Sequence, residues 1–453
     1  MRITNIRVVG LHGFISDELT FDNELAIIVG MNGAGKTSIL NLTANLLKLD
    51  IPALAKTRFA NFEIKGRVGT KAFVLDAVRS KNGVEVAIKQ SGKLIGRHNL
   101  VLPKRGDDSF DDRANRFAYD RAIRRTYDLL SESAVSRYLR DHAKLTLVKL
   151  DRTLFAEEND GLTALESPVA ARRLAAQEAV DPIERVTQVT SDRYNAYRIA
   201  LRKHSEDLMR QILLQLFKSP ATIFEAKSAK QSKLSSQQIE AIRKKLVKMP
   251  YFAEGGDVAS QINDYFSLAN SSVDLHGTKG AKKGDEEQTF IRLLFRDFEF
   301  PRIIGLVKAF EAFEKADNAS REELDRFERL VNSFLLEGGK EVFFSEKEAL
   351  LRFRLKNSTD QVGRPISELS SGERQIVTVL TYLAFMAGPN SIFVVDEPEL
   401  SLHLSWQMKL VDALMQLRPA DGQLILATHS PEIVGKYRKS VVKLEPVFEE
   451  VIA

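Results

Sequence analysis

The sequence predicts an α/β fold that is divided by a long, mostly helical segment. Short apolar runs typical of buried strands occur near both ends of the chain, at residues 25–29 and 391–396. From about residue 113 to residue 340, apolar side chains recur instead at roughly the helical period. We therefore expect residues 1–112 and 341–453 to be two halves of one α/β unit, with a helical insertion at 113–340.

The first hundred residues predict strands, a glycine-rich loop and a helix. Residues 2–11 alternate between apolar and polar, 25–29 form a continuous apolar run, and a helix-forming segment follows at 38–47. Two further alternating runs, 72–79 and 84–90, flank an Asn-Gly pair, which is a strong signal for a β-hairpin. We expect a mixed sheet, with an antiparallel N-terminal layer beside the strand at 25–29.

The middle segment carries apolar residues at helical spacing over 183–217 and 301–336. Within 301–336, Ser320 and Glu323 have the spacing of a capping box, so we expect two antiparallel helices there. Most of this insertion is interpreted as structural. The strand and helix alternation then returns, with strands expected at 340–344, 350–355, 391–397 and 424–430 and helices at 371–387 and 402–417.

Composition excludes several classes of function. The 453-residue chain has no cysteine, which excludes disulfides, zinc–thiolate sites, iron–sulfur clusters and thiol nucleophiles. The most apolar stretch, 376–388, falls short of the roughly 18–20 residues that span a bilayer, and the N-terminus lacks a signal-peptide core. We expect a cytoplasmic protein that does not enter a membrane.

The charge balance is mild, with 66 basic and 61 acidic residues and a net charge of +5. The basic residues concentrate in 226–248, where Glu240 is the one acidic side chain, and again at Lys279, Lys282 and Lys283. Such runs bind phosphates or an acidic protein in some proteins and are solvated surface in others. Both interpretations stay open for this chain.

A phosphate-binding loop follows the strand at 25–29. The pattern G-x-x-x-x-G-K-[ST] is fulfilled between a predicted strand and a predicted helix, which is the context that confirms it. Glycines allow backbone N–H groups to surround phosphates, Lys36 supplies a positive charge at the β- and γ-phosphates, and the Thr37 hydroxyl can ligate Mg²⁺. The candidate nucleotide-binding residues are Gly30, Asn32, Gly33, Ala34, Gly35, Lys36, Thr37 and Ser38.

Two carboxylates end the apolar strand at 391–396. Doubly wound sheets bind ligands at the carboxyl ends of their strands, which is where Asp396 and Glu397 fall. We expect Asp396 to hold Mg²⁺, directly or through water, as the second metal-binding residue beside Thr37. We expect Glu397 to act as the general base on the attacking water, a contribution of about 10²–10⁴-fold in rate.

Three more segments complete a family pattern. Leu369-Ser370-Ser371-Gly372-Glu373 precedes an apolar helix, and Ser370 lies 21 residues before Ser391, where the Asp396 strand begins. In this order the motifs resemble those of an ABC-type ATPase, of the soluble class that includes RecF, SMC proteins and the overcoming-lysogenization-defect (OLD) nucleases. The resemblance covers roughly residues 1–100 and 340–445. It implies a Walker A loop at 30–37, a signature at Ser370, Ser371, Gly372 and Glu373, a Walker B strand at 391–397, a D-loop with Ser401 and His403, and a switch histidine, His429, that senses the γ-phosphate.

The details of the motifs point to one branch of this class. Transporter members usually have Gly and Gln in the signature, where this chain has Ser371 and Glu373. The segment DEPELSLH resembles the DEPE-x-x-LH pattern of bacterial AAA-15/AAA-21 type ATPases, with Leu404 where proline is usual. No Q-loop glutamine is assigned: Gln90 lies beside a predicted hairpin turn and Gln177 in the helical part.

The resemblance also implies that one chain does not complete a site by itself. In such ATPases the signature of one protomer completes the phosphate site of another, head to tail. Ser370 and the Gly372 amide would face ATP and Mg²⁺ held by a second copy. We therefore expect a homo-oligomer, a dimer of heads at minimum.

No nuclease motif accompanies these residues in the sequence. The length and the irregular helical insertion resemble the stand-alone ATPase subunit of two-gene phage-defence systems, the PARIS type first, whose partner is a TOPRIM-like nuclease, and the Septu type second, with an HNH partner. The resemblance implies a sensor and scaffold that controls a separate nuclease effector in response to a phage-derived trigger. The basic segment 226–248 would read that trigger, either DNA or an acidic protein that imitates it.

Two alternatives of other classes remain. A DNA-repair or chromosome-maintenance ATPase of RecF or SMC type would clamp DNA directly, with steeply salt-dependent binding that ATP strengthens. A nucleotide-binding subunit of a transporter is disfavoured by the signature variant and by the large insertion.

Overall fold

The computed structural model describes residues 1–21, 24–81, 83–101, 113–149, 155–156, 181–217, 240, 243–244, 260–261, 263–266, 300–360 and 362–449. Contacts divide the chain into two units, Met1–Tyr194 with Glu323–Ala453, and Asn195–Glu322. The boundaries fall inside two long helices, α7 (Pro182–Leu216) and α13 (Phe300–Leu335). They differ from the expected limits of the insertion at 113 and 340, because tertiary contacts rather than helical periodicity decide the division.

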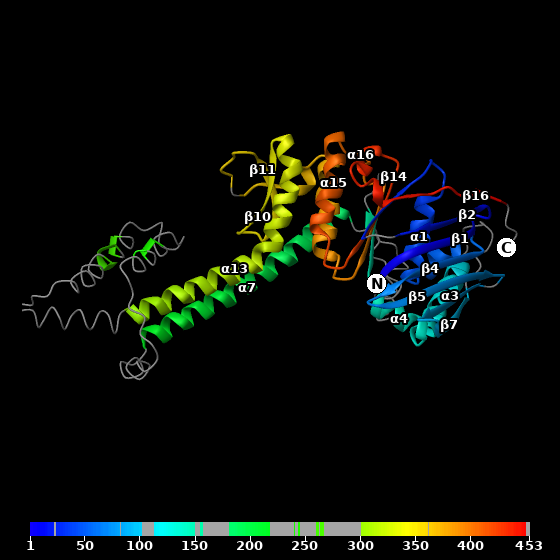
Figure 1. The fold of residues 1–453 in the computed structure, drawn as a ribbon, viewed down its shortest axis with the longest axis horizontal. Helices are drawn as coiled ribbons and strands as arrows, with labels where there is room; N and C mark the ends of the chain where they lie inside the picture. The colour runs from blue at the N-terminus through cyan, green and yellow to red at the C-terminus, as the bar shows by residue number, and fades with distance from the viewer. Residues whose placement is uncertain are drawn as a thin grey trace, which may run out of the picture. The chain divides into compact units, whose positions relative to one another are not determined.

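An antiparallel sheet forms one layer of the first unit (Figure 1). Its strands follow the order β16-β2-β1-β4-β5-β6-β7, so six of the seven come from residues 1–101. β5 and β6 form the predicted hairpin, with Ser80 paired to Gly83. The bounds are β1 Arg2–Leu11, β2 Ile15–Thr20, β4 Asn61–Val68, β5 Lys71–Ser80, β6 Gly83–Gln90, β7 Lys93–Val101 and β16 Val447–Phe448.

A second, mostly parallel sheet forms another layer of the first unit. Its order is β15-β3-β14-β13-β8-β9, and every pair is parallel except the last. The strand β8 was not expected, because residues 145–149 lie inside the segment that the sequence predicts to be helical. The bounds are β3 Leu25–Val29, β8 Leu145–Lys149, β9 Phe155–Ala156, β13 Ile392–Asp396, β14 Gln423–Thr428 and β15 Val441–Lys443.

Short helices and a small antiparallel sheet complete this unit. The small sheet has the order β10-β11-β12 (Lys340–Ser345, Leu350–Leu355, Arg364–Pro365). Three single 3₁₀ turns lie at Leu336–Gly338, Ile366–Glu368 and Arg438–Ser440, and a π-helical turn at Tyr382–Met386 continues α14. The helices are α1 Lys36–Leu47, α2 Ile51–Lys56, α3 Arg113–Ser131, α4 Ala134–His142, α14 Ser371–Thr381, α15 Leu404–Leu417 and α16 Pro431–Val434.

One hydrophobic core joins the two sheets of this unit. It contains buried side chains from β1, β4, β5 and β6, from α1, and from one face of β13 and β14. On β13 that face is Ile392 and Val394, while the intervening Phe393 and Val395 are buried outside this core. Because both faces of β13 are covered, all of its side chains before Asp396 are apolar, and its sequence is a continuous apolar run. The two sheets, with helices between and around them, form a mixed α/β architecture.

The polar side chain of Gln423 ties the two sheets together. Its amide oxygen accepts a hydrogen bond from the Ile3 N–H at 2.8 Å, and its amide nitrogen donates to the Ile3 carbonyl at 2.8 Å. Gln423 opens β14 and is 1% exposed. The side chain thereby replaces a neighbouring strand for one residue of β1, so that these buried backbone groups are paired.

The expected pair of antiparallel helices over 301–336 is wrong, because α13 is a single helix. The spacing from Phe313 to Leu324 is three helical turns, so the apolar stripe continues without a change of phase. Ser320 donates to the Ala316 carbonyl at 2.9 Å, four residues back, and so does not cap a new helix. With no Gly or Pro at 317–320, nothing in the backbone stops the helix.

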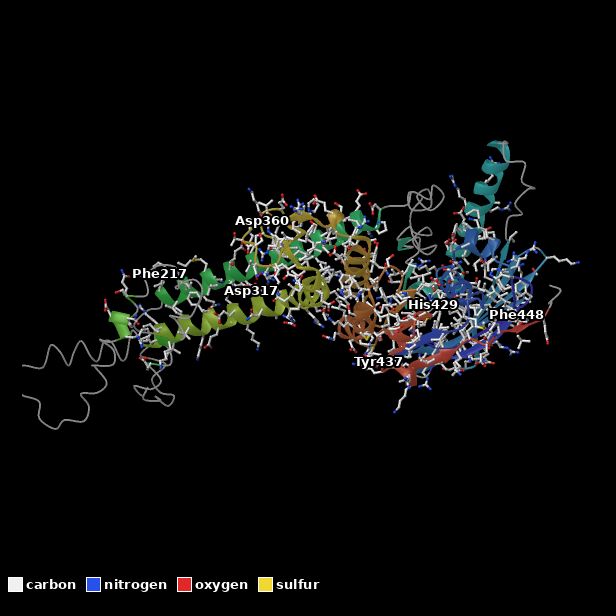
Figure 2. The ribbon with its side chains drawn as sticks, turned by 90° about the horizontal axis from the view of Figure 1, so that it is seen from above. Phe217, Asp317, Asp360, His429, Tyr437 and Phe448 are labelled. Atoms are coloured by element: carbon white, nitrogen blue, oxygen red, sulfur yellow. The ribbon has the colours of Figure 1, made fainter. Side chains whose placement is uncertain are left out.

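Within the second unit, α7 and α13 lie side by side, as Figures 1 and 2 both show. Polar contacts join them: the Tyr197 hydroxyl donates to Asp317 at 3.1 Å, and the His204 ring lies 3.0 Å from the Ser320 hydroxyl. No helix in the described part of the chain combines the length and the hydropathy needed to cross a bilayer.

Candidate functional site

A glycine-rich loop joins β3 to α1 and carries the predicted nucleotide-binding residues. Gly33 and Gly35 have positive φ, 83° and 95°, a conformation that glycine adopts without steric penalty. Left-handed residues in such a turn curve the backbone into a nest of N–H groups that binds anions. The loop is also close-packed, since a Cβ built on Gly30 would lie 3.1 Å from the Leu444 carbonyl oxygen.

Lys36 is the first residue of α1, and its side chain folds back over this loop. The ammonium donates to the Gly30 carbonyl at 2.8 Å and to the Met31 carbonyl at 3.3 Å, and Lys36 is only 6% exposed. An ammonium has three protons, and among the described residues no third acceptor contacts it. The loop therefore presents a charged donor beside the positive end of the α1 dipole.

The other loop residues divide between the tip and the base. Asn32 and Thr37 are exposed, whereas Ala34 is buried. Ser38 lies at the base, where its hydroxyl is 2.9 Å from Nε2 of His12. His12 follows β1 with a positive φ of 56°. Sequence reasoning missed His12, because a contact across 26 residues leaves no local pattern.

The two carboxylates stand at the end of β13. Asp396 is buried, and Glu397 is half-buried with a positive φ of 49°. Its N–H still donates to the Ala427 carbonyl at 2.9 Å, so β14 fixes the turn that aims the side chain. A non-glycine residue in this region costs about 1 kcal/mol or more, and such strain is found most often at functional sites.

The register of the parallel sheet brings these segments to one edge. Ala427 on β14 pairs with Ile28 on one side and with Asp396 on the other. The phosphate loop, Glu397 and His429 all begin one or two residues beyond this row, at the carboxyl ends of adjacent strands about 4.8 Å apart. This is the edge at which open α/β sheets bind ligands.

His429, which is labelled in Figure 2, follows the last residue of β14, and its side chain is 51% exposed. Its ring nitrogen Nδ1 lies 3.1 Å from Oε1 of Glu399. Glu399 is the second glutamate of the DEPE segment and is buried. The sequence predicts a role for His429 but not for this partner, although Glu399 lies inside the DEPE motif.

The signature segment forms the start of α14. Ser370 is the N-cap, and with Glu373 it makes a full capping box: the Glu373 N–H approaches the Ser370 hydroxyl at 3.4 Å, and the Ser370 N–H donates to the Glu373 carboxylate at 2.8 Å. Ser370 and Ser371 are exposed. The segment thus offers hydroxyls and a helix N-terminus to solvent, a geometry suited to an anion.

Gly372 is required by a close approach of the predicted D-loop. A Cβ built on Gly372 would lie 2.6 Å from the Ser401 carbonyl oxygen, a distance that real side chains do not tolerate. Ser401 has a positive φ of 60°. His403 is the N-cap of α15, where its Nδ1 accepts a hydrogen bond from the Ser405 N–H at 3.4 Å. In this structure the His403 ring is therefore a helix cap.

The structure gives the contacts of two glutamines that can be compared with the unassigned Q-loop glutamine. Gln90, at the end of β6, donates to the Tyr138 hydroxyl on α4 at 3.1 Å, which is a contact between the antiparallel sheet and that helix. Gln375, on α14, is 3% exposed and donates to the Pro398 carbonyl at 3.1 Å. Gln375 was not predicted, and it links the signature helix to the DEPE segment.

The basic segment 226–248 lies outside the described residues, apart from Glu240, Arg243 and Lys244, and so do Lys279, Lys282 and Lys283. In the part that is described, Arg243 is paired with Glu240. The role of this segment as a trigger-binding surface stays a prediction.

The residues at the sheet edge fit a nucleoside triphosphate and Mg²⁺. The loop supplies left-handed glycines and a buried ammonium, which are donors for phosphate oxygens. The Thr37 hydroxyl and the Asp396 carboxylate are oxygen ligands, the type that Mg²⁺ prefers.

Comparisons with known proteins agree with this chemistry. The family described as "AAA domain, putative AbiEii toxin, Type IV TA system" matches residues 256–435, a range that contains the signature, the two carboxylates and His429. UvrABC system protein A of Deinococcus radiodurans is 31% identical over 74 residues, which are 16% of this chain and 7% of that protein.

Two further relatives match over similar lengths. An "Uncharacterized ABC transporter ATP-binding protein" of Haemophilus influenzae is 30% identical over 81 residues, 18% of this chain and 30% of that protein. "Protein ea59" of Escherichia phage lambda is 32% identical over 84 residues, 18% of this chain and 16% of that protein. The chain thus spans less than a third of each relative's length. The family match and these relatives support an ATPase of the AAA/ABC type.

Proposed function

We propose that this chain binds ATP with Mg²⁺ at the carboxyl edge of the parallel sheet, hydrolyses it, and uses the cycle to assemble and release copies of itself. The observation that carries this proposal is the register of β3, β14 and β13, which places the phosphate loop, His429 and Glu397 at one edge. A phosphate-binding loop, a general base and a γ-phosphate sensor must meet within one site for hydrolysis, and the residues that we propose for these roles lie at the same edge of the sheet.

Each residue then has a definite task. The loop amides and the Lys36 ammonium bind the β- and γ-phosphates, and Thr37 and Asp396 hold Mg²⁺, which when bound neutralises phosphate charge. Glu397 accepts a proton from the attacking water, and His429, in its protonated form with an N–H on both ring nitrogens, donates from Nε2 to the γ-phosphate. Ser370 and Gly372 of a second copy complete the pocket, as the resemblance to ABC-type ATPases implies, so the nucleotide joins two protomers.

The biological setting that we propose is anti-phage defence. The ATP-bound oligomer would hold a separate nuclease effector and control it in response to a phage-derived trigger, with the PARIS type of two-gene system as the nearest pattern and the Septu type as the next. The match to a family whose description names a type IV toxin–antitoxin system supports this setting.

Nucleotide chemistry is tested with paired substitutions. Lys36→Ala should abolish ATP binding in a fluorescent-nucleotide assay, whereas Lys56→Ala, at an exposed lysine that ends α2, should bind as the wild type does. Glu397→Gln should bind ATP, turn it over at least about 10²-fold more slowly and accumulate as the assembled oligomer in light scattering. The exposed Glu368→Gln is its control. Wild-type turnover in Glu397→Gln would remove Glu397 as the base.

The defence setting is tested separately, by a native pull-down of the chain from its own host followed by mass spectrometry. A stoichiometric nuclease supports the proposal. If no nuclease is recovered, and the purified chain binds DNA in a salt-dependent way that ATP strengthens, the DNA-clamping alternative replaces it.

A further inference from the structure

The buried carboxylate of Glu399 lies directly behind the predicted switch histidine. Its side chain is 6% exposed, and a single oxygen, Oε1, makes all of its polar contacts with the described residues. Oε1 accepts from the Thr428 hydroxyl at 2.7 Å, from the His429 N–H at 2.8 Å and from the Ser430 N–H at 3.2 Å. These three hydrogen bonds, from consecutive residues, hold the backbone at the end of β14 against the DEPE segment.

The imidazole ring adds a fourth contact to the same oxygen. Nδ1 of His429 lies 3.1 Å from Oε1. A carboxylate can only accept, so this contact favours the tautomer that carries its proton on Nδ1. Nε2, on the far side of the ring, then has its lone pair exposed when the ring is neutral, and is a second N–H donor when the ring is protonated. The half-exposed ring has no other described partner in the structure.

A purely structural tie would not need a charge at this position. The second oxygen of Glu399, Oε2, is buried and has no hydrogen-bond partner among the described residues. A buried polar atom without a partner costs about 1–3 kcal/mol, and more when charged. A neutral amide could accept the same three bonds from Thr428, His429 and Ser430 at lower cost. A carboxylate at position 399 has a purpose if its negative charge acts on the imidazole ring of His429.

We propose that Glu399 is a positioning residue that fixes the orientation and the tautomer of His429, so that Nε2 faces the sheet edge where the γ-phosphate is expected. The arrangement is that of a carboxylate behind a functional histidine, which sets the ring and the proton position of that histidine. The inference rests on the proposed function, because it gives His429 its ligand. The tautomer of His429 can be measured without any nucleotide.

The first measurement is therefore spectroscopic. Imidazole ¹⁵N shifts are recorded on the nucleotide-free full chain above about pH 8, where an ordinary imidazole is neutral, and the His429 signals are assigned by their loss in His429→Ala. The wild type should show the Nδ1–H tautomer, and Glu399→Gln should shift His429 toward Nε2–H. A wild-type ring that is protonated on Nε2 overturns the proposal.

A matched variant separates positioning from general support of the loop. Thr428→Val removes one donor to Oε1 and leaves the charge of Glu399 in place, with nearly the same side-chain shape. It should lower the melting temperature and leave the His429 tautomer unchanged. An equal change of tautomer in Thr428→Val and Glu399→Gln would mean that loop geometry alone sets the ring, against the proposal.

The second measurement is a double-mutant cycle on ATP turnover. Glu399→Gln should lower kcat by roughly tenfold to a hundredfold with little change in KM, by analogy with the losses seen when the carboxylate partner of a metal-ligating histidine is replaced. In a His429→Ala background the same substitution should have almost no further effect on kcat. A full additional loss in that background would show that Glu399 acts independently of His429. If His429→Ala turns over ATP normally, the role of His429 in the proposed function fails, while the spectra still decide the tautomer.

Discussion

Lys340 donates hydrogen bonds to both carboxylate oxygens of Glu373, at 3.0 and 2.8 Å. Lys340 opens β10, and Glu373 is the last residue of the signature segment and closes the capping box of Ser370. The ammonium also lies 5.8 Å from the centroid of the Phe353 ring, on β11. The start of the signature helix is thereby fastened to the small sheet through one buried carboxylate.

The ion pair predicts a specific dependence of stability on pH. Burial acts to raise the pKa of Glu373, but hydrogen bonds from Lys340 and Ser370 outweigh it, so that the pKa lies below its ordinary value of 4.5. The stabilisation is therefore complete above about pH 4.5 and is lost as the pH falls through the lower, folded pKa. Melting temperatures of the wild type and Glu373→Gln should differ at neutral pH and converge in acid. A difference that persists unchanged at the lowest pH would contradict the ion pair, and the exposed Glu368→Gln serves as control.

Replacing Gln423 by leucine should destabilise the first unit by about 2–4 kcal/mol. The substitution leaves the N–H and the carbonyl of Ile3 buried without partners, and each such group costs about 1–3 kcal/mol. Thermal unfolding followed by circular dichroism measures the loss. Gln188→Leu, at an exposed position of α7, should change stability by less than about 0.5 kcal/mol. Equal effects of the two substitutions would refute the role given to Gln423.

Complementation between two inactive variants tests the shared site. Ser371→Glu places a negative charge in the exposed first turn of α14, where it suits the helix dipole but repels a phosphate. The fold should be preserved while turnover is lost, and Lys36→Ala should be inactive for want of phosphate binding. A mixture of the two contains pockets with an intact Lys36 from one copy and an intact signature from the other, so ATPase activity should reappear. A mixture as inactive as its components would show that each chain uses its own signature.

Glu397→Gly should make the protein more stable and inactive at once. Glycine removes the strain of a positive φ at this position, which is worth up to about 1 kcal/mol, and deletes the proposed general base. Asp421→Gly is the matched control, because Asp421 also has a positive φ, 57°, and is exposed away from the sheet edge. It should leave ATP turnover unchanged. A lower melting temperature for Glu397→Gly would show that the side chain is held by favourable contacts that outweigh its strain.

The sequence predicted the parts of this structure that depend on local patterns. The loop at 30–37, the apolar strands β3, β13 and β14, and the β5–β6 hairpin each carry their signal within at most about twenty consecutive residues. By contrast, the membership of β8 in the parallel sheet depends on its pairing with β13, some 250 residues away in the chain, and no periodicity reports such a contact. The sequence did not predict the contact between His12 and Ser38, or the one between Glu399 and His429, for the same reason.

The turn expected near Ser320 failed for a different reason. The capping-box spacing of Ser320 and Glu323 is real, but it does not oblige a helix to begin. The same serine hydroxyl can bond the carbonyl four residues back, and here it does. Where a capping signal coincides with an apolar stripe that keeps its phase, continuity of the stripe decides the structure.

The strand β3, which leads into the phosphate loop, has β14 on one side and β15 on the other, and both come from residues beyond 420. During synthesis on the ribosome, the phosphate loop therefore emerges early and then waits with both edges of its strand unpaired until the chain has passed residue 443. Such a delay exposes an apolar strand to wrong partners. A truncated translation product would carry the phosphate loop without its neighbours, and we expect the nascent chain to depend on chaperones for longer than its size alone suggests.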